Sequence, residues 1–284
     1  MNPYRPFAVR LSARERLSPS FVRITLAGDD LATCGAILLD QRVKLLFGVR
    51  EVLDALVAAP DWYPAWLALP DVDRPVLRTY TLSAVRADAD GSAEVDIDVA
   101  IHAVGEGEGA AEGSPGLRFA LHAPLGTPTV LVAGDATVAG HDTVGVAWHP
   151  GGARDVLLVG DETALPAVVN IAATLPADAV GQIILEVPES GDERSFAHPG
   201  GVRVTWLARD RGEQAGGVFG QAAGESGEPE ELLWDEVAGD GVRYGWIAGE
   251  TGWVNRLRAE ARAAGVPKGQ VAFMGYWKRG AAGT

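Results

Sequence analysis

The sequence predicts two domains of different class: an antiparallel six-stranded β-barrel over residues 1–150 and an α/β domain with a parallel sheet over residues 151–284. Three observations support this. The chain has 284 residues, too many for one small core and suited to two domains of ordinary size. Its first half contains short, partly alternating apolar runs between turn residues, a pattern typical of antiparallel strands. After residue 152, continuous apolar runs alternate with helical patterns, as in parallel sheets with right-handed crossovers.

Six runs in the first half are predicted to form the barrel. They are FAVRLSARERL (7–17), SFVRITLAG (20–28), QRVKLLFGV (41–49), VLRTYTLSAV (76–85), AEVDIDVAIHAV (93–104) and DTVGVAW (142–148). Between the third and fourth runs, residues 51–69 predict a helix or an irregular excursion. The glycine-rich, acidic residues 105–116 predict a mobile loop.

The second half predicts alternating strands and helices. Its strands are DVLLVG (155–160), QIILEVPE (182–189), VRVTWLAR (202–209), GVRYGWIAG (241–249) and QVAFMGYW (270–277). Helical patterns follow the first and the fourth of these strands. Residues 209–231 are rich in glycine and glutamate and predict a flexible excursion.

Composition and charge exclude several function classes. The formal net charge of −14 disfavours nucleic acid or an anionic membrane as the main partner, so an anionic ligand needs a local basic patch. The single cysteine, Cys34, excludes internal disulfides and an iron–sulfur cluster. The five histidines show no metal-ligand spacing, so redox chemistry here requires an organic cofactor. Without an export signal or a membrane span, the protein is expected to be cytoplasmic and not inserted in a membrane.

The stretch RPVLRTYTLS (74–83) carries the first candidate binding residues. In a strand, Arg78 and Tyr80 project to one face and Thr81 to the other. A guanidinium suits phosphate, and an aromatic face suits a flat ring. The alternative is an ordinary ladder of arginine and tyrosine on the wet face of a sheet.

Two strand-to-helix turns and the last strand carry the second group of candidates. Gly160 ends one strand and Gly249 ends another, and ligands of open α/β sheets gather at such carboxyl ends. Neither turn is a GxGxxG fingerprint, and both are equally consistent with simple helix capping. The last strand delivers Trp277, Lys278 and Arg279 to the same edge, where they suit a planar cofactor and an anionic substrate. The alternative is a packing aromatic and a solvated basic tail.

Together these pieces resemble the siderophore-interacting protein family, FAD-dependent ferric-siderophore reductases of the ferredoxin-reductase-like superfamily. The matching segments run along nearly the whole chain. They are VKLLF (43–47), RPVLRTYT (74–81), DIDVAIH (96–102), DTVGVA (142–147), LVGDETALPAV (158–168), WIAGETG (246–252) and GYWKRG (275–280). The combination of LVGDETALPA, WxAGE and a terminal GYW is highly specific.

The resemblance implies a role for each candidate. In the FAD site, Arg78 would reach the phosphates, Tyr80 would stack on the isoalloxazine and Thr81 would hydrogen-bond near its N5. The remaining FAD residues implied are Thr79, His102, Trp277 and the start of a pyrophosphate-binding helix at Ser114, Pro115, Gly116 and Leu117. The nicotinamide-nucleotide residues implied are Gly160, Asp161, Glu162, Thr163, Ala164, Glu186, Gly249 and Glu250. The cations implied to hold an anionic ferric chelate are Lys44, Lys278 and Arg279, each equally consistent with a solvated surface side chain.

The implied reaction passes a hydride from NADPH to the flavin and then single electrons to Fe(III) held by a siderophore, so that Fe(II) is released. The resemblance favours NADPH over NADH and leaves ferredoxin as another donor. Arg209 and Arg211 are candidates for the 2′-phosphate. A monomer is expected.

Two departures from the family pattern keep other functions open. Ser83 stands where the family commonly has a second arginine, and Arg86 is a candidate to compensate. Residues 122–140 are interpreted as an insertion that forms an extra β-hairpin or lid. These departures favour, as an alternative, a siderophore-binding protein with decayed cofactor function. A general NAD(P)H–flavin reductase for another acceptor is a separate alternative.

Overall fold

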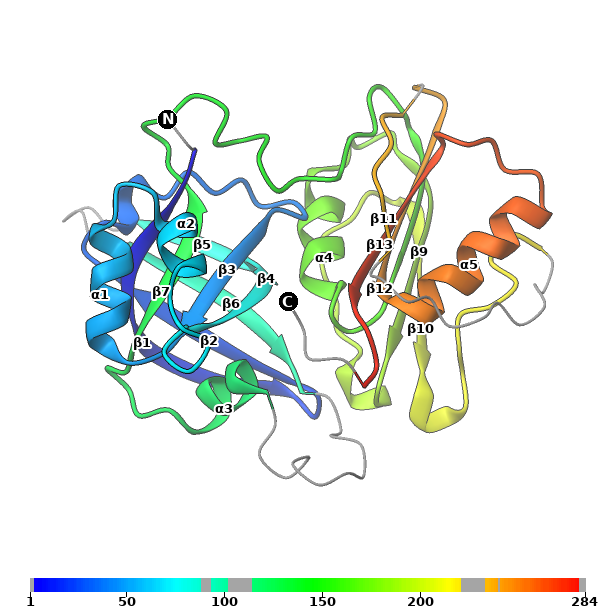
Figure 1. Ribbon diagram of the computed structural model, residues 1–284. Coiled ribbons are helices and arrows are strands. Elements are labelled where there is room, and N and C mark those ends of the chain that lie inside the picture. Colours follow the sequence, from blue (N-terminus) through cyan, green and yellow to red (C-terminus); the bar gives the residue numbers. More distant parts are fainter. Residues whose placement is uncertain (1–2, 88–92, 102–113, 221–232, 240, 281–284) are drawn as a thin grey trace. The chain divides into compact units, whose positions relative to one another are not determined.

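The computed structural model describes residues 3–87, 93–101, 114–220, 233–239 and 241–280 (Figure 1). The chain forms two compact units, Met1–Val146 and Ala147–Gly283, each with its own hydrophobic core. None of the described helices is long and apolar enough to cross a membrane.

The first unit is a curled antiparallel sheet with the strand order β4-β3-β7-β1-β2-β6-β5. The strands are β1 (Tyr4–Ser18), β2 (Phe21–Ala27), β3 (Arg42–Phe47), β4 (Val76–Thr81), β5 (Ala84–Ala87), β6 (Ala93–Ala100) and β7 (Pro128–Gly134). Alternate residues of these strands, among them Phe7, Ile24 and Leu131, are fully buried inside the curl. Strand alternation therefore builds the core that the sequence pattern predicts.

Helices cover parts of the first unit. The stretch expected to be a helix or an excursion forms α1 (Arg50–Ala58) and α2 (Trp62–Leu67), and their Leu53, Leu56 and Trp62 pack on the outer face of the sheet. Residues 102–113, which include most of the expected mobile loop 105–116, lie outside the described part. The last residues of that expected loop instead form the cap and first turn of α3 (Pro115–His122).

Two expectations for the first unit are wrong, one for residues 122–140 and one for residues 142–148. Residues 122–140 are not an insertion, because β7 lies inside the sheet and pairs with both β1 and β3. Its Val130–Ala133 run is buried on both faces, which removes the alternation that marks an antiparallel strand. Residues 142–148, expected to be a strand, form none; the backbone of Val144 and Gly145 instead accepts hydrogen bonds from Tyr4 and Arg42.

The strand count also differs from six. In the described residues the first unit has seven strands, because the single predicted run 76–85 is divided at Leu82 and Ser83 into β4 and β5. The two halves pair with different neighbours, β4 with β3 and β5 with β6, and so form the two edges of the curled sheet.

The second unit is a mixed sheet with the order β10-β9-β8-β12-β13-β11. Its elements are β8 (Asp155–Gly160), α4 (Leu165–Thr174), β9 (Val180–Val187), β10 (Gly201–Ala208), β12 (Arg243–Glu250), α5 (Thr251–Ala263) and β13 (Val271–Trp277). These five strands are parallel, and the short β11 (Trp234–Asp235) is antiparallel to β13. Figure 1 shows α4 and α5 on opposite faces of the sheet. All five carboxyl ends therefore point to one edge.

Candidate functional site

The strand β4 shows the expected alternation. Arg78 lies opposite the buried Leu45 of β3, and Tyr80 lies opposite the buried Val43, so Arg78 and Tyr80 share the core-facing side. Thr79 lies opposite Lys44 on the other side, and the Lys44 Nζ donates to the Thr79 Oγ1 at 3.2 Å. A guanidinium and a phenol ring thus lie on one face of an edge strand.

Arg78 is a half-buried cation without a carboxylate partner among the described residues. Within the described part of the chain, its Nη1 donates to the backbone oxygen of Leu77, at 2.8 Å. Burial lowers the pKa of Arg78, although the guanidinium stays charged at any physiological pH. A partly desolvated cation with no acid beside it favours an anionic ligand.

Tyr80 packs directly against the first turn of α3. A Cβ built on Gly116 would lie 1.9 Å from the Tyr80 hydroxyl oxygen, so glycine is what allows the helix to approach the ring. Burial raises the pKa of Tyr80 to about 12, which keeps the phenol neutral. The Ser114 side chain caps α3 by accepting from the Leu117 backbone N–H, and Pro115 starts the helix.

These groups fit the chemistry of FAD. A guanidinium without an acid partner and the amide end of an eight-residue helix are both suited to a pyrophosphate. The Tyr80 ring supplies an aromatic surface, and Thr79 and Thr81 supply hydroxyls on the same strand. Thr81 is 7% exposed and Thr79 is exposed. His102 lies outside the described residues.

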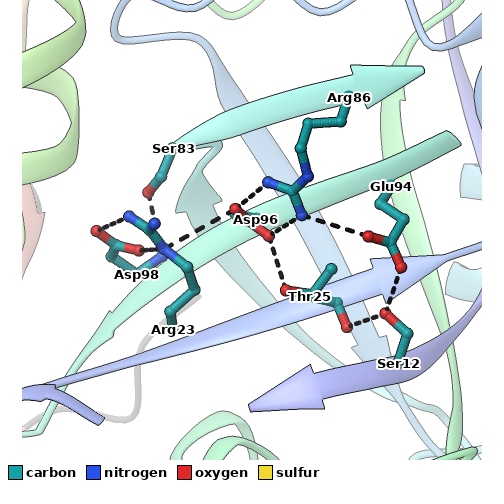
Figure 2. A network of polar contacts seen from close by, with 8 residues as sticks. All are labelled: Ser12, Arg23, Thr25, Ser83, Arg86, Glu94, Asp96 and Asp98. Carbon is teal, nitrogen blue, oxygen red and sulfur yellow. Dashed lines mark hydrogen bonds and ion pairs between the residues drawn. The ribbon is translucent and has the colours of Figure 1, made fainter. Parts of the chain in front are cut away.

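Arg86 does not replace the missing arginine at position 83. It forms an ion pair with Asp96 and a weaker one with Glu94, while Arg23 binds Asp98 with two hydrogen bonds (Figure 2). The Ser83 hydroxyl accepts from the Asp98 backbone N–H at 3.2 Å. Arg86 is therefore a counter-ion of the β6 carboxylates, and Arg78 remains the candidate phosphate ligand of this strand pair.

Asp96 of β6 makes the first unit sensitive to acid. Burial acts to raise the pKa of Asp96, but hydrogen bonds from Arg86 and Thr25 and the charges of Arg86 and Arg23 outweigh it, so the pKa is lowered. A carboxyl with a lower pKa in the folded state stabilises the protein above its unfolded value of about 3.9, and this contribution is lost as the pH falls through the folded value.

We therefore expect Asp96→Asn to lower the free energy of unfolding by about 1–3 kcal/mol at pH 7. Denaturant titrations at pH 7 and near pH 3 measure this, and the difference from the wild type should shrink at the lower pH. The matched control is Glu94→Gln, since that side chain is 39% exposed and should cost less than about 1 kcal/mol. An equal deficit for Asp96→Asn at both values would contradict the electrostatic explanation.

In the second unit, Asp161 joins three strand ends. Its Oδ1 accepts from the backbone N–H and the hydroxyl of Thr163, at 2.8 and 2.5 Å. Its Oδ2 accepts from the Glu250 backbone N–H at 2.7 Å and from the Trp277 indole N–H at 2.8 Å. Burial and then the charge of Glu162 raise the pKa of Asp161 to about 6. Gly249 is required here because a Cβ would lie 2.6 Å from the Asp161 Cγ.

Glu162 and Glu186 are likewise internal. Both are buried and share one counter-ion, Arg209, whose Nη2 lies 2.8 Å from the Glu162 Oε1 and whose Nη1 lies 3.2 Å from the Glu186 Oε1. The second oxygen of Glu186 accepts from the Ala215 backbone N–H and the Trp253 indole. Through these contacts, Glu162 and Glu186 stabilise the carboxyl edge of the parallel sheet.

The structure brings all eight expected nucleotide residues to the carboxyl edge of β8, β9 and β12. Six of them are buried, namely Gly160, Asp161, Glu162, Ala164, Glu186 and Gly249, whereas Thr163 and Glu250 are half-buried. Glu250 caps α5 by accepting from the Trp253 N–H and also accepts from the Arg279 N–H.

Sequence reasoning missed two features of these sites. The contact between Gly116 and Tyr80 joins residues 36 positions apart, and nothing in either local pattern signals it. Arg42 was also missed, although it lies two residues from Lys44 and therefore on the same face of β3. Burial and then Arg42 lower the pKa of Lys44, and no carboxylate of the described residues pairs with Lys44.

Comparisons with known proteins identify the family. Residues 10–136 match the model of the siderophore-interacting FAD-binding domain, and residues 153–280 match that of the siderophore-interacting protein. An uncharacterised protein of Mycobacterium tuberculosis is 30% identical over 277 residues, 96% of this chain and 90% of its own length. The chain belongs to the siderophore-interacting protein family.

Other relatives carry functional names or solved structures. The ferric vibriobactin reductase ViuB of Vibrio cholerae is 28% identical over 272 residues, 94% of this chain and 87% of that protein. The structure of the siderophore-interacting protein SipS from Aeromonas hydrophila has a TM-score of 0.63 and 26% identity, covering 98% of this chain and all of that one. A ferredoxin reductase of carbazole 1,9a-dioxygenase is similar in fold alone, with a TM-score of 0.54 and 14% identity over 97% of this chain and 70% of its own.

Proposed function

We propose that this protein is an FAD-dependent reductase of ferric siderophores that takes its electrons from a nicotinamide dinucleotide. Arg78 is the single observation that carries the proposal. It is a half-buried guanidinium without a carboxylate partner in the described part of the chain, and it shares one face of β4 with Tyr80, which packs against the start of α3. The family match and the similarity to a ferric vibriobactin reductase support the same conclusion.

In this proposal the first unit holds the cofactor. Arg78 and the backbone amide of Gly116 bind the pyrophosphate, and Tyr80 presents its ring to the flat part of the molecule. The Leu117 N–H is already held by the Ser114 cap. Thr79 and Thr81 orient it by hydrogen bonds. Bound FAD supplies the step that no side chain provides, because a flavin accepts electrons in a pair and releases them singly.

Each unit carries cations that are proposed candidates for binding the substrate. Lys44 and Arg42 share one face of β3, and Lys278 and Arg279 follow β13. Such cations suit an anionic iron chelate, whose Fe(III) binds hard oxygen donors more tightly than Fe(II) does. Reduction therefore releases the metal.

Anaerobic turnover tests the function. The purified, FAD-loaded chain is mixed with NADH or NADPH and a ferric siderophore, and Fe(II) is trapped with a ferrous chelator. Flavin bleaching followed by Fe(II) formation supports the proposal. A protein that takes up no FAD yet binds the ferric chelate would instead be a binding module, and one that reduces flavin but no ferric chelate would be a general flavin reductase.

Lys44→Gln is expected to raise the KM for an anionic ferric chelate roughly three- to tenfold, since one nearby charge contributes about 1 kcal/mol at a partly exposed site. The rate with a neutral acceptor should stay unchanged. The matched control is Lys268→Gln, which removes one positive charge after α5. If both acceptors slow equally with Lys44→Gln, the lysine has a structural role instead.

A further inference from the structure

The two arginines that follow β10 are each bound by two carboxylates. Arg209 contacts Glu162 at 2.8 Å and Glu186 at 3.2 Å. Arg211 contacts Glu193 at 2.6 Å and Glu213 at 2.8 Å. Both arginines belong to the short helix η4 (Arg209–Arg211), which directly follows β10. A nucleotide bound at the carboxyl edge of this sheet would place its adenosine ribose near the ends of β9 and β10.

Arg209 is committed to the protein interior. Its partners Glu162 and Glu186 have side chains that are only 2% and 6% exposed. If the guanidinium turned toward an external phosphate, both buried carboxylates would lose their counter-ion, which is far more costly than the loss of a surface ion pair. Arg209 therefore acts as an internal counter-ion and is unsuited to hold a ligand phosphate.

Arg211 is exposed, but the negative charges of its carboxylate neighbours outnumber its single positive charge. Glu193 and Glu213 both contact its Nη2, and the exposed Asp210 accepts from the Ser190 backbone N–H and hydroxyl at 3.0 and 2.9 Å. One exposed guanidinium is thus paired with two carboxylates, and a third carboxylate precedes it in the chain. This arrangement is the reverse of that in the first unit, where Arg78 has no acid partner among the described residues.

We propose that this acidic edge selects a dinucleotide without a 2′-phosphate, so that NADH is preferred to NADPH, with Glu193 and Glu213 as the specificity-determining residues. The inference rests on the proposed function, since it concerns the electron donor of that reaction. A free ribose diol can donate to a carboxylate, whereas a 2′-phosphate brings a second anion beside Glu193 and Glu213. This reverses the preference for NADPH that the family resemblance favours.

Two measurements on the full, FAD-loaded chain test the inference. Anaerobic stopped-flow gives the second-order rate constant of flavin reduction by NADH and by NADPH, and calorimetry gives the affinities for NAD⁺, NADP⁺, 5′-AMP and 2′,5′-ADP. We expect NADH to be favoured by at least about tenfold, and 2′,5′-ADP to bind no more tightly than 5′-AMP.

The dependence on ionic strength tests whether the protein repels or attracts the 2′-phosphate. Added salt screens exposed charges within about 8–10 Å at physiological concentration. Since repulsion limits NADPH in this account, the ratio of the NADPH to the NADH rate constant should rise with salt. A phosphate held by an arginine would make that ratio fall with salt, which would contradict the inference.

The variants separate the residues involved. Glu213→Gln and Glu193→Gln should each raise the NADPH to NADH ratio about two- to fivefold, the effect of one exposed charge. The matched control Asp178→Asn removes one charge beside the amino end of β9 and should leave the ratio unchanged. Arg211→Gln and Arg194→Gln each remove one positive charge and should lower the ratio by no more than about two- to fivefold. A loss of tenfold or more that is selective for NADPH would mean that the arginine holds the 2′-phosphate, and this would overturn the inference.

The outcomes also separate the two proposals. A wild-type preference for NADPH overturns the NADH inference and leaves the reductase function standing. If dithionite reduces the flavin but neither nucleotide binds to the protein or reduces the flavin, a nicotinamide donor is excluded. The electron donor of the proposed function and the preference for NADH are then both wrong.

Discussion

Replacing Gly116 with alanine will weaken FAD binding by at least about tenfold and lower the free energy of unfolding of the first unit by about 1–3 kcal/mol, the usual cost of overpacking. The new Cβ would lie 1.9 Å from the Tyr80 hydroxyl oxygen, too close for any contact. Either the ring or the start of α3 must move, and both belong to the proposed flavin site. FAD fluorescence quenching and denaturant unfolding measure the two effects.

The control for this variant is a rescue. Tyr80→Phe removes only the hydroxyl and should by itself change FAD binding little, because the aromatic surface remains. In the double variant the nearest atom to the new Cβ is the ring Cζ at 3.2 Å, a distance that small shifts accommodate. The double variant should therefore regain most of the lost affinity. A double variant as weak as Gly116→Ala alone would contradict the packing between Gly116 and Tyr80 as the cause.

Asp161→Asn will destabilise the second unit by about 2–4 kcal/mol near pH 8. One oxygen of asparagine still accepts from Thr163, but its NH₂ group then faces the N–H donors of Glu250 and Trp277. Each buried donor without an acceptor costs about 1–3 kcal/mol. Since the Glu250 turn and Trp277 are both released, nucleotide binding should weaken as well.

Thermal unfolding followed by tryptophan fluorescence measures this effect. The matched control is Asp155→Asn, the same substitution at the start of the same strand, where an exposed pair with Arg243 should contribute no more than about 1 kcal/mol. If Asp161→Asn is as stable as Asp155→Asn, Asp161 does not join the strand ends in the way described.

Much of the fold could be predicted because local patterns carry it. The alternation at 78–81 and the strand–turn–helix pattern around Gly160 both appear in the structure as expected. The errors have a physical reason too. A strand buried on both faces, such as β7, loses its alternation, and the following Gly134 and Asp135 make the run look like a hairpin turn.

The polar partners of the candidate sites could not be predicted. Asp161 and Trp277 are 116 positions apart, and Glu162 meets Arg209 from another strand end. The types of these residues suggested ligand binding, but only the spatial arrangement shows that Asp161, Glu162 and Glu186 hold the edge together. The sequence likewise suggested Arg86 as a phosphate ligand, because its charge suits a phosphate. The structure shows instead that Arg86 is paired with Asp96.

The central claim is that Arg78 and the start of α3 grip the pyrophosphate of a flavin dinucleotide. Titration of the full chain with FAD and with riboflavin, followed by flavin fluorescence, tests it most directly, because riboflavin has the same ring system and no phosphate. We predict that FAD binds at least about 100-fold more tightly, a difference of about 2.7 kcal/mol. Equal affinities for the two, or no binding of FAD, would contradict the claim.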